Sequence, residues 1–238
     1  MNKDILFEYN KIKKYNKVVI IATSIVQLLF LYFFTIVGRF EAPTADNILN
    51  KYSAVVGLAS TITICSLTIY GTIVINSFIV CNFIGDSRAR TYLYPGGRNK
   101  LYYRKTITFI ITSILMLLIG STIANIIFFV SENITPILQS NTNVSQDIIT
   151  FVISPLVIGL IVTTMVIISS IAGIYFSSTT STIIAGIIFV VFFGNLIAIS
   201  FIKYQYILLL ISTLMVFLDL FGIKMMGNKI RNDEILYK

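Results

Sequence analysis

Long apolar stretches alternate with short polar connections along the whole chain. Each stretch is about as long as the roughly 20 residues that a helix needs to cross a bilayer. The stretches lie at residues 18–38, 53–81, 106–130, 150–174, 182–200 and 207–223. This pattern predicts an all-α integral membrane protein with six transmembrane helices, in which one transmembrane domain covers residues 1–238.

The basic residues fall almost entirely on alternate sides of these stretches. Five precede the first stretch, six lie in residues 82–105 and four follow the last stretch, whereas the other side has only Arg39, Lys51 and Lys203. Because Lys and Arg mark cytoplasmic loops, we expect both termini in the cytoplasm and an extracellular loop at residues 131–149. The many Ile, Asn and Lys residues and the absence of Trp hint at a bacterium, so we expect a multi-pass protein of a bacterial plasma membrane.

Residues 1–17 have the pattern of an amphipathic helix. Ile5, Leu6, Tyr9 and Ile12 follow helical spacing, and lysines occupy other parts of the helical wheel. We therefore expect an interfacial helix that lies on the cytoplasmic side before the chain turns into the first span. A frayed basic tail is the alternative.

Composition narrows the classes of function. The net charge of +8 is concentrated beside the apolar stretches, so attraction to an anionic lipid surface explains it and no nucleic-acid partner is expected. The chain has no His and no Gly-x-x-x-x-Gly-Lys-Ser/Thr phosphate loop, which removes histidine-based chemistry and ATP hydrolysis of that kind. Cys65 and Cys81 would lie about 24 Å apart on one helix, too far for a shared metal or a disulfide. We expect no enzyme activity and no cofactor on this chain.

The second apolar stretch carries a stripe of polar residues. It lacks any charge from residue 53 to residue 83, and a straight helix of that length would measure about 46 Å, so it must tilt or continue past the membrane. The stripe follows one helical face and consists of Thr61, Cys65, Thr68, Thr72 and Asn76. This face is a candidate lining for a translocation path. Alternatively, these side chains bond to their own helix or pack against a neighbouring one, although Asn76 costs more to bury than the others.

One acidic residue, Asp219, falls within the last apolar stretch, about one turn from its cytoplasmic end. A carboxylate at bilayer depth is costly. It is either a proton or ion site, or an acid that reaches the interface or pairs with Lys224.

Residues 82–105 form the longest polar stretch and have an individual pattern. Ser87 can cap a short helix whose apolar face is Ala89, Tyr92 and Leu93, and a Pro-Gly-Gly turn ends it. A basic loop that only fixes topology is the alternative.

The six-span layout and this loop resemble permease subunits of type-2 ABC exporters. In that family the first cytoplasmic loop carries an acidic residue, a Thr–Leu stretch, a Pro-x-x-Arg step and a Lys at the entry to the third span. The same order is found here as Asp86, Thr91, Leu93, Pro95, Arg98 and Lys105. The chain differs from the family at Asp86, where Glu is usual, and at Ala89-Arg90, where a Gly commonly precedes the Thr. The part between the fifth and sixth spans is also shorter than the re-entrant hairpin of larger members.

The resemblance implies that the loop 82–105 docks as a coupling helix on a separate ATP-binding cassette ATPase subunit, which would hold ATP and Mg. The contact residues implied are Asp86, Arg88, Ala89, Arg90, Tyr92, Leu93 and Arg98. It also implies a second permease, either a copy of this chain or a homologue. The compact size looks most like bacterial permeases that export, or give immunity to, antimicrobial and amphipathic peptides. A secondary transporter and a non-transporting membrane scaffold are the alternatives.

Overall fold

The computed structural model describes residues 3–40, 51–85, 87–92, 97–134 and 144–232. Within these ranges every regular element is a helix. In chain order the elements are α1 (Lys3–Phe40), α2 (Tyr52–Ile75), the π-helix η2 (Asn76–Val80), α3 (Cys81–Phe83), α4 (Ser87–Tyr92), α5 (Arg98–Ile134), α6 (Val144–Tyr175), α7 (Thr179–Lys203) and α8 (Gln205–Arg231).

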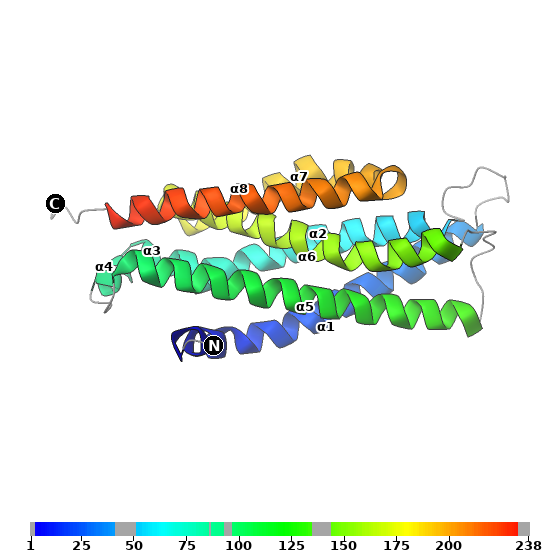
Figure 1. Cartoon of the computed structure of the whole chain (residues 1–238), viewed down its shortest axis with the longest axis horizontal. Helices are drawn as coiled ribbons and strands as arrows, with labels where there is room; N and C mark the ends of the chain where they lie inside the picture. The colour runs from blue at the N-terminus through cyan, green and yellow to red at the C-terminus, as the bar shows by residue number, and fades with distance from the viewer. Residues whose placement is uncertain (1–2, 41–50, 86, 93–96, 135–143, 233–238) are drawn as a thin grey trace.

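Within the described ranges, six helices are long and apolar enough to cross a membrane: α1, the continuous run from α2 to α3, α5, α6, α7 and α8. Successive spans run in opposite directions along one elongated bundle (Figure 1). α2 and α6 lie in the middle of the bundle, with α1 and α5 packed on one side of this pair and α7 and α8 on the other. The chain is therefore a multi-pass membrane protein, as the apolar stretches predict.

The two ends of the bundle differ. α4, the beginning of α1 and the end of α8 lie at the same end, which we call the α4 end (Figure 1). The end of α1, the beginning of α6 and the turn between α7 and α8 lie at the opposite end.

Burial separates the middle helices from the outer ones. α6 contributes fully buried side chains such as Val157 and Ile158, whereas α7 and α8 expose large apolar side chains such as Phe192 and Phe221. Such a surface would be unfavourable in water, but it suits a helix in hydrocarbon because its backbone groups are bonded within the helix.

The N-terminal segment does not form a separate helix. Residues 3–17 are helical, as predicted, but they continue into the first span as one helix of 38 residues. No Gly or Pro occurs between Lys3 and Val37, so no helix-breaking residue ends the helix near residue 17. Ile12 and Asn16 are buried within the bundle.

The described connections are short. Residues 131–134 belong to α5 and residues 144–149 to α6, so only the central part of the loop expected at 131–149 connects these helices. α6 and α7 are joined by a three-residue turn, and a single residue separates α7 from α8. The short helix expected in the loop 82–105 is present as α4, and α5 begins at Arg98.

Candidate functional site

The short helix α4 is held against the end of the bundle. Gly85 precedes it with a φ of +57°, a conformation that a residue with a side chain rarely adopts, and its carbonyl accepts a hydrogen bond from the backbone N–H of Arg88 at 3.1 Å. Thr91 is buried, and its hydroxyl donates to the carbonyl of Arg88 at 2.7 Å. These two local bonds order α4 itself, and the burial of Thr91 together with packing on α3 and α5 holds the helix against the bundle.

Behind α4 lies a pocket of about 460 Å³, its open mouth included, which we call the α4 pocket. Residues of α3, α4, α5, α6, α8 and the α6–α7 turn line it: Phe83, Arg88, Thr91, Arg98, Ile174, Ser177, Met226, Lys229 and Ile230. Three of these residues are cationic and none is acidic. The pocket therefore suits an anionic group.

Contacts with helix ends position two of these cations. Arg98 Nη2 donates to the carbonyl of Arg231 at 3.4 Å. Lys229 Nζ donates to the carbonyl of Tyr175 at 3.4 Å and lies 3.7 Å from the centroid of the Tyr175 ring. Because the carbonyls at a helix C-terminus attract cations, these contacts join the ends of α5, α6 and α8 at the α4 pocket.

The residues expected to contact an ATPase have different positions. Arg88 and Arg98 line the α4 pocket, and Ala89 is exposed on α4. Arg90 and Tyr92 belong to α4, but their side chains are not among those that the structure describes. Asp86 and Leu93 lie outside the described residues. The predicted apolar face of α4 is thus described only at Ala89.

The polar stripe of α2 packs against neighbouring helices. The hydroxyls of Thr61, Thr68 and Thr72 donate to carbonyls of their own helix at 2.7 to 2.9 Å. One contact crosses to another helix, since Thr68 Oγ1 lies 3.8 Å from Met165 Sδ in α6. Cys65 lies beside Gly194 of α7, where an added Cβ would be 3.6 Å from Cys65 Sγ. These contacts match the packing alternative for the Thr and Cys residues.

The last residue of the stripe, Asn76, begins the π-helix η2. Its side chain is half-buried, and its Oδ1 atom is buried without a hydrogen-bond partner. In the same π-helix the carbonyl of Phe78 accepts hydrogen bonds from the side chains of Lys105 and Asn82. Because π-turns in α-helices often mark functional positions, this part of the second span is the most distinctive.

Asp219 is 4% exposed, and its Oδ1 atom has no hydrogen-bond partner. Among the residues that the structure describes, no ion pair is found for its carboxylate, and the side chain of Lys224 is exposed. The described residues therefore do not show the expected pairing with Lys224, and the position of Asp219 relative to the interface stays a prediction.

A buried polar network was not predicted. Gln27 Nε2 donates to Ser60 Oγ at 3.2 Å, Thr63 Oγ1 donates to Gln27 Oε1 at 2.6 Å, and Asn125 Nδ2 donates to Ser154 Oγ at 2.9 Å. A longer contact of 3.5 Å joins Gln27 and Asn125, so the network connects α1, α2, α5 and α6. The sequence could have indicated this network, because Gln27 and Asn125 are the only amide side chains in the first and third apolar stretches.

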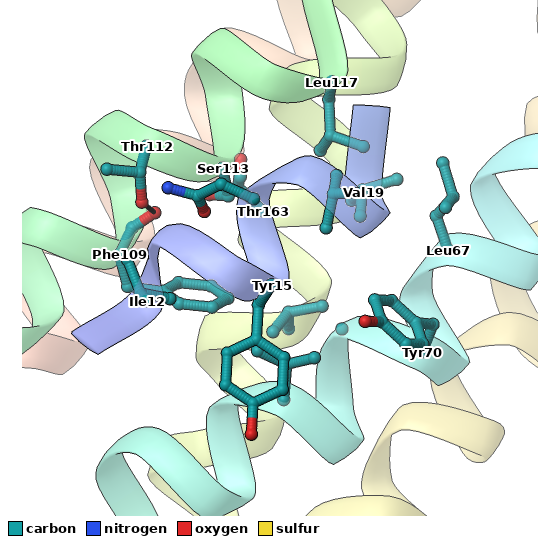
Figure 2. Close-up of a pocket in the computed structure, with 15 residues that line it drawn as sticks. Ile12, Tyr15, Val19, Leu67, Tyr70, Phe109, Thr112, Ser113, Leu117 and Thr163 are labelled. Carbon is teal, nitrogen blue, oxygen red and sulfur yellow. Dashed lines mark hydrogen bonds between the residues drawn. The ribbon is translucent and has the colours of Figure 1, made fainter. Parts of the chain in front are cut away.

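A second pocket, which we call the α1 pocket, lies between α1, α2, α5 and α6 (Figure 2). It measures about 460 Å³ with its open mouth. Its lining consists of Ile12, Tyr15, Asn16, Val19, Leu67, Tyr70, Gly71, Val74, Phe109, Thr112, Ser113, Leu117, Val162, Thr163 and Val166. α2 contributes Leu67, Tyr70, Gly71 and Val74, which lie on a different face from the polar stripe.

Comparisons of the chain with models of protein families, with curated proteins and with solved structures found no match. Its class therefore rests on its own sequence and structure. The chain is a multi-pass membrane protein whose described part is α-helical, with six apolar helices of spanning length and a short helix at one end of the bundle.

Proposed function

We propose that the chain is the transmembrane permease subunit of an ATP-driven ABC exporter in a bacterial plasma membrane. It moves hydrophobic or amphipathic peptides, antimicrobial peptides among them, out of the cell or the membrane. The α4 end faces the cytoplasm, because most Lys and Arg residues flank the spans on that side. A separate ATP-binding cassette subunit hydrolyses ATP, and a second permease completes the path.

The observation that carries the proposal is the way in which α4 is built into the bundle. α4 connects the second span to the third, and through the α4 pocket it shares a surface with the ends of α6 and α8. A force applied to α4 therefore reaches the second and third spans directly, through α3 and α5, and the ends of α6 and α8 line the same pocket. This is the mechanical requirement for a helix that couples the closure of an ATPase to movement of the spans.

The charges at this end favour an acidic partner. Arg88, Arg98 and Lys229 line the α4 pocket, and Lys100 is exposed one turn away at the start of α5. A cationic rim orients an acidic partner and raises the rate of association. The small apolar contact inside the rim supplies most of the affinity.

The proposal is tested by co-purification of the chain with candidate ATP-binding cassette subunits. Ala89→Asp and Leu93→Asp place a charge in the proposed apolar contact. Each should weaken association by at least about 1–2 kcal/mol and uncouple ATP hydrolysis from peptide export, at unchanged expression. Phe176→Asp is the matched control, because Phe176 is exposed at the same end but lies in the α6–α7 turn. If Leu93→Asp keeps full association and coupled export, the coupling role of α4 is wrong.

A secondary transporter is the second candidate, and the buried, unpaired carboxyl of Asp219 favours it. The two candidates differ in their energy source. Export that continues after the proton gradient is dissipated but stops when ATP is depleted supports the permease. The opposite dependence, together with loss of transport in Asp219→Asn, supports the secondary transporter, and a membrane scaffold shows no transport under either condition.

A further inference from the structure

We propose that the α1 pocket binds an acyl chain of an anionic diacyl phospholipid from the leaflet at the α4 end. The Asn16 side chain donates a hydrogen bond to an ester carbonyl of this lipid, and the lysines of α1 attract its phosphate. The proposal does not depend on the transport activity proposed above.

The shape and lining of the pocket fit a hydrocarbon chain. Figure 2 shows Tyr15 of α1 and Tyr70 of α2 extending into the space between these two helices, with Phe109 of α5 on the far side of α1. Tyr15 is partly exposed at the surface of the bundle, so the pocket is open to the surrounding lipid beside this ring. Leu67 and Leu117 give the interior an apolar wall.

One buried polar group among the described residues of this lining lacks a partner. The hydroxyls of Thr112, Ser113 and Thr163 donate to carbonyls of their own helices, so their hydrogen-bonding capacity as donors is already used. Asn16 is different, because it is 6% exposed and its Nδ2 atom has no hydrogen-bond partner. A buried amide donor without an acceptor is unfavourable. The pocket therefore favours an apolar ligand that also carries an acceptor.

The depth of Asn16 identifies that acceptor. The apolar run of the first span begins at residue 18, and two residues of helix correspond to about 3 Å. The proposal therefore places Asn16 just outside the hydrocarbon layer, which is the level of the ester carbonyls that join the acyl chains of a phospholipid to its headgroup. An ester carbonyl accepts hydrogen bonds, and the chain attached to it extends toward the apolar part of the pocket.

Exposed lysines of α1 close to Asn16 along the chain favour an anionic lipid. Lys13, Lys14 and Lys17 are exposed on α1 within one turn of Asn16. Lys11 is engaged with Glu8 at 3.1 Å, whereas the described residues offer no ion pair to the other three lysines. Clusters of basic residues beside a span attract anionic headgroups, each contributing roughly 1 kcal/mol, or about fivefold in affinity.

The absence of Trp from the chain allows a direct test. Phe109→Trp places one fluorophore in the lining of the pocket at a position that is 5% exposed, so acyl chains reach it only through the pocket. Ile111→Trp, exposed on the same helix, reports contact with bulk lipid. In vesicles, we measure the mole fraction of brominated phospholipid that quenches half of the Phe109→Trp fluorescence. This mole fraction should be at least about threefold lower for an anionic than for a zwitterionic phospholipid. Both lipids should quench Ile111→Trp equally.

Variants separate the two contacts of the lipid. Asn16→Leu in the Phe109→Trp background should reduce quenching by both lipids, because both carry ester carbonyls, whereas Asn133→Leu at the exposed end of α5 should not. Replacing Lys13, Lys14 and Lys17 by Gln should remove the preference for the anionic lipid, whereas Lys100→Gln should keep it.

A filling variant gives an independent result. Ser113→Leu leaves Asn16 and the lysines in place but occupies the pocket, so quenching of Phe109→Trp should be lost while that of Ile111→Trp is kept. Equal quenching of Phe109→Trp by the two lipids would overturn the proposal. The proposal would also be overturned if neither lipid quenched Phe109→Trp and an added amphipathic peptide changed its fluorescence. The pocket would then bind a peptide.

Discussion

The Lys105 ammonium donates a hydrogen bond of 2.9 Å to the backbone carbonyl of Phe78 and lies 5.0 Å from the centroid of the Phe78 ring. Lys105 belongs to α5 and is 6% exposed, whereas Phe78 lies in the middle of the π-helix η2. A charged donor on a carbonyl and the face of an aromatic ring are both favourable surroundings for a buried cation. This pair therefore fastens the irregular turn of the second span to the third span.

Loss of this contact should destabilise the bundle. Lys105→Met keeps most of the side-chain volume but removes the donor, and we expect the free energy of unfolding to fall by about 1.5–3 kcal/mol, because hydrogen bonds to charged groups have this magnitude. Unfolding in mixed micelles measures the change. Lys100→Met, which is exposed on the same helix, should alter stability by less than about 0.5 kcal/mol. Equal effects of the two variants would show that the Phe78 contact contributes nothing.

Two glycines of α7 should respond in opposite ways to Ala. A Cβ on Gly186 would overlap Thr72 Cγ2, and the β-branched Thr72 has little freedom to move. Gly186→Ala should therefore destabilise the bundle by about 1–3 kcal/mol. A Cβ on Gly194 would lie at an ordinary contact distance of 3.6 Å from Cys65 Sγ, so Gly194→Ala should be neutral or stabilise by up to about 1 kcal/mol. Thermal unfolding of both variants in the same detergent decides between these outcomes.

Gln27 and Thr63 should be energetically coupled. Thr63 Oγ1 donates to Gln27 Oε1 at 2.6 Å between α1 and α2, and both side chains are fully buried. A double-mutant cycle with Gln27→Leu and Thr63→Val should give a coupling energy of about 0.6–1.7 kcal/mol, the range for hydrogen bonds between membrane helices. Additive effects would mean that each side chain finds another partner when the first is removed.

The orientation in the membrane can be tested by labelling. After Cys65 and Cys81 are replaced by Ser, a membrane-impermeant thiol reagent added outside the cell should modify Asn141→Cys but not Lys100→Cys. The reason is the excess of basic residues on the side of the membrane that holds residues 82–105. The reverse labelling pattern would place the α4 end outside and remove the basis for a cytoplasmic ATPase contact.

Replacement of the buried acid should increase stability. Because the carboxyl of Asp219 is buried with one oxygen unpartnered, Asp219→Leu should raise the free energy of unfolding by about 1–3 kcal/mol. Asp147→Leu should instead lower the free energy of unfolding. Asp147 lies in the first turn of α6, where the helix dipole favours an acid by about 0.3–1 kcal/mol. A destabilising Asp219→Leu would mean that the carboxyl is stabilised in the folded bundle.

The span count could be predicted from the sequence because apolar length alone decides whether a helix can cross a bilayer. The short helix in the loop 82–105 was also predicted, since a capping Ser87 and a Pro-Gly-Gly turn are local signals. The N-terminal helix was expected to be separate from the first span, whereas it continues into that span as one helix. Its amphipathic pattern fits both a separate helix and the first turns of a longer one, and the burial of Ile12 and Asn16 depends on tertiary packing that the pattern does not reveal.

The candidate site was harder to predict because its components come together across helices. The stripe from Thr61 to Thr72 is visible in the sequence, but spacing does not tell whether a helical face borders a path or another helix. The α1 pocket depends on how four helices diverge around Asn16 and leaves no periodic signal. Single amide side chains within apolar stretches, such as Gln27 and Asn125, were the strongest indication of buried polar contacts that the sequence analysis did not use.

The π-helix η2 also sets the rotational phase of everything that follows it. A π-turn accommodates one residue more than an α-turn, so side chains beyond Val80 point about 100° away from the directions that an unbroken α-helix would give them. Phe83 meets the Tyr102 ring edge-on at 5.6 Å only in this phase. A chain with one residue fewer in this turn would have almost the same hydropathy and length, yet it would carry α4 round to another side of the bundle.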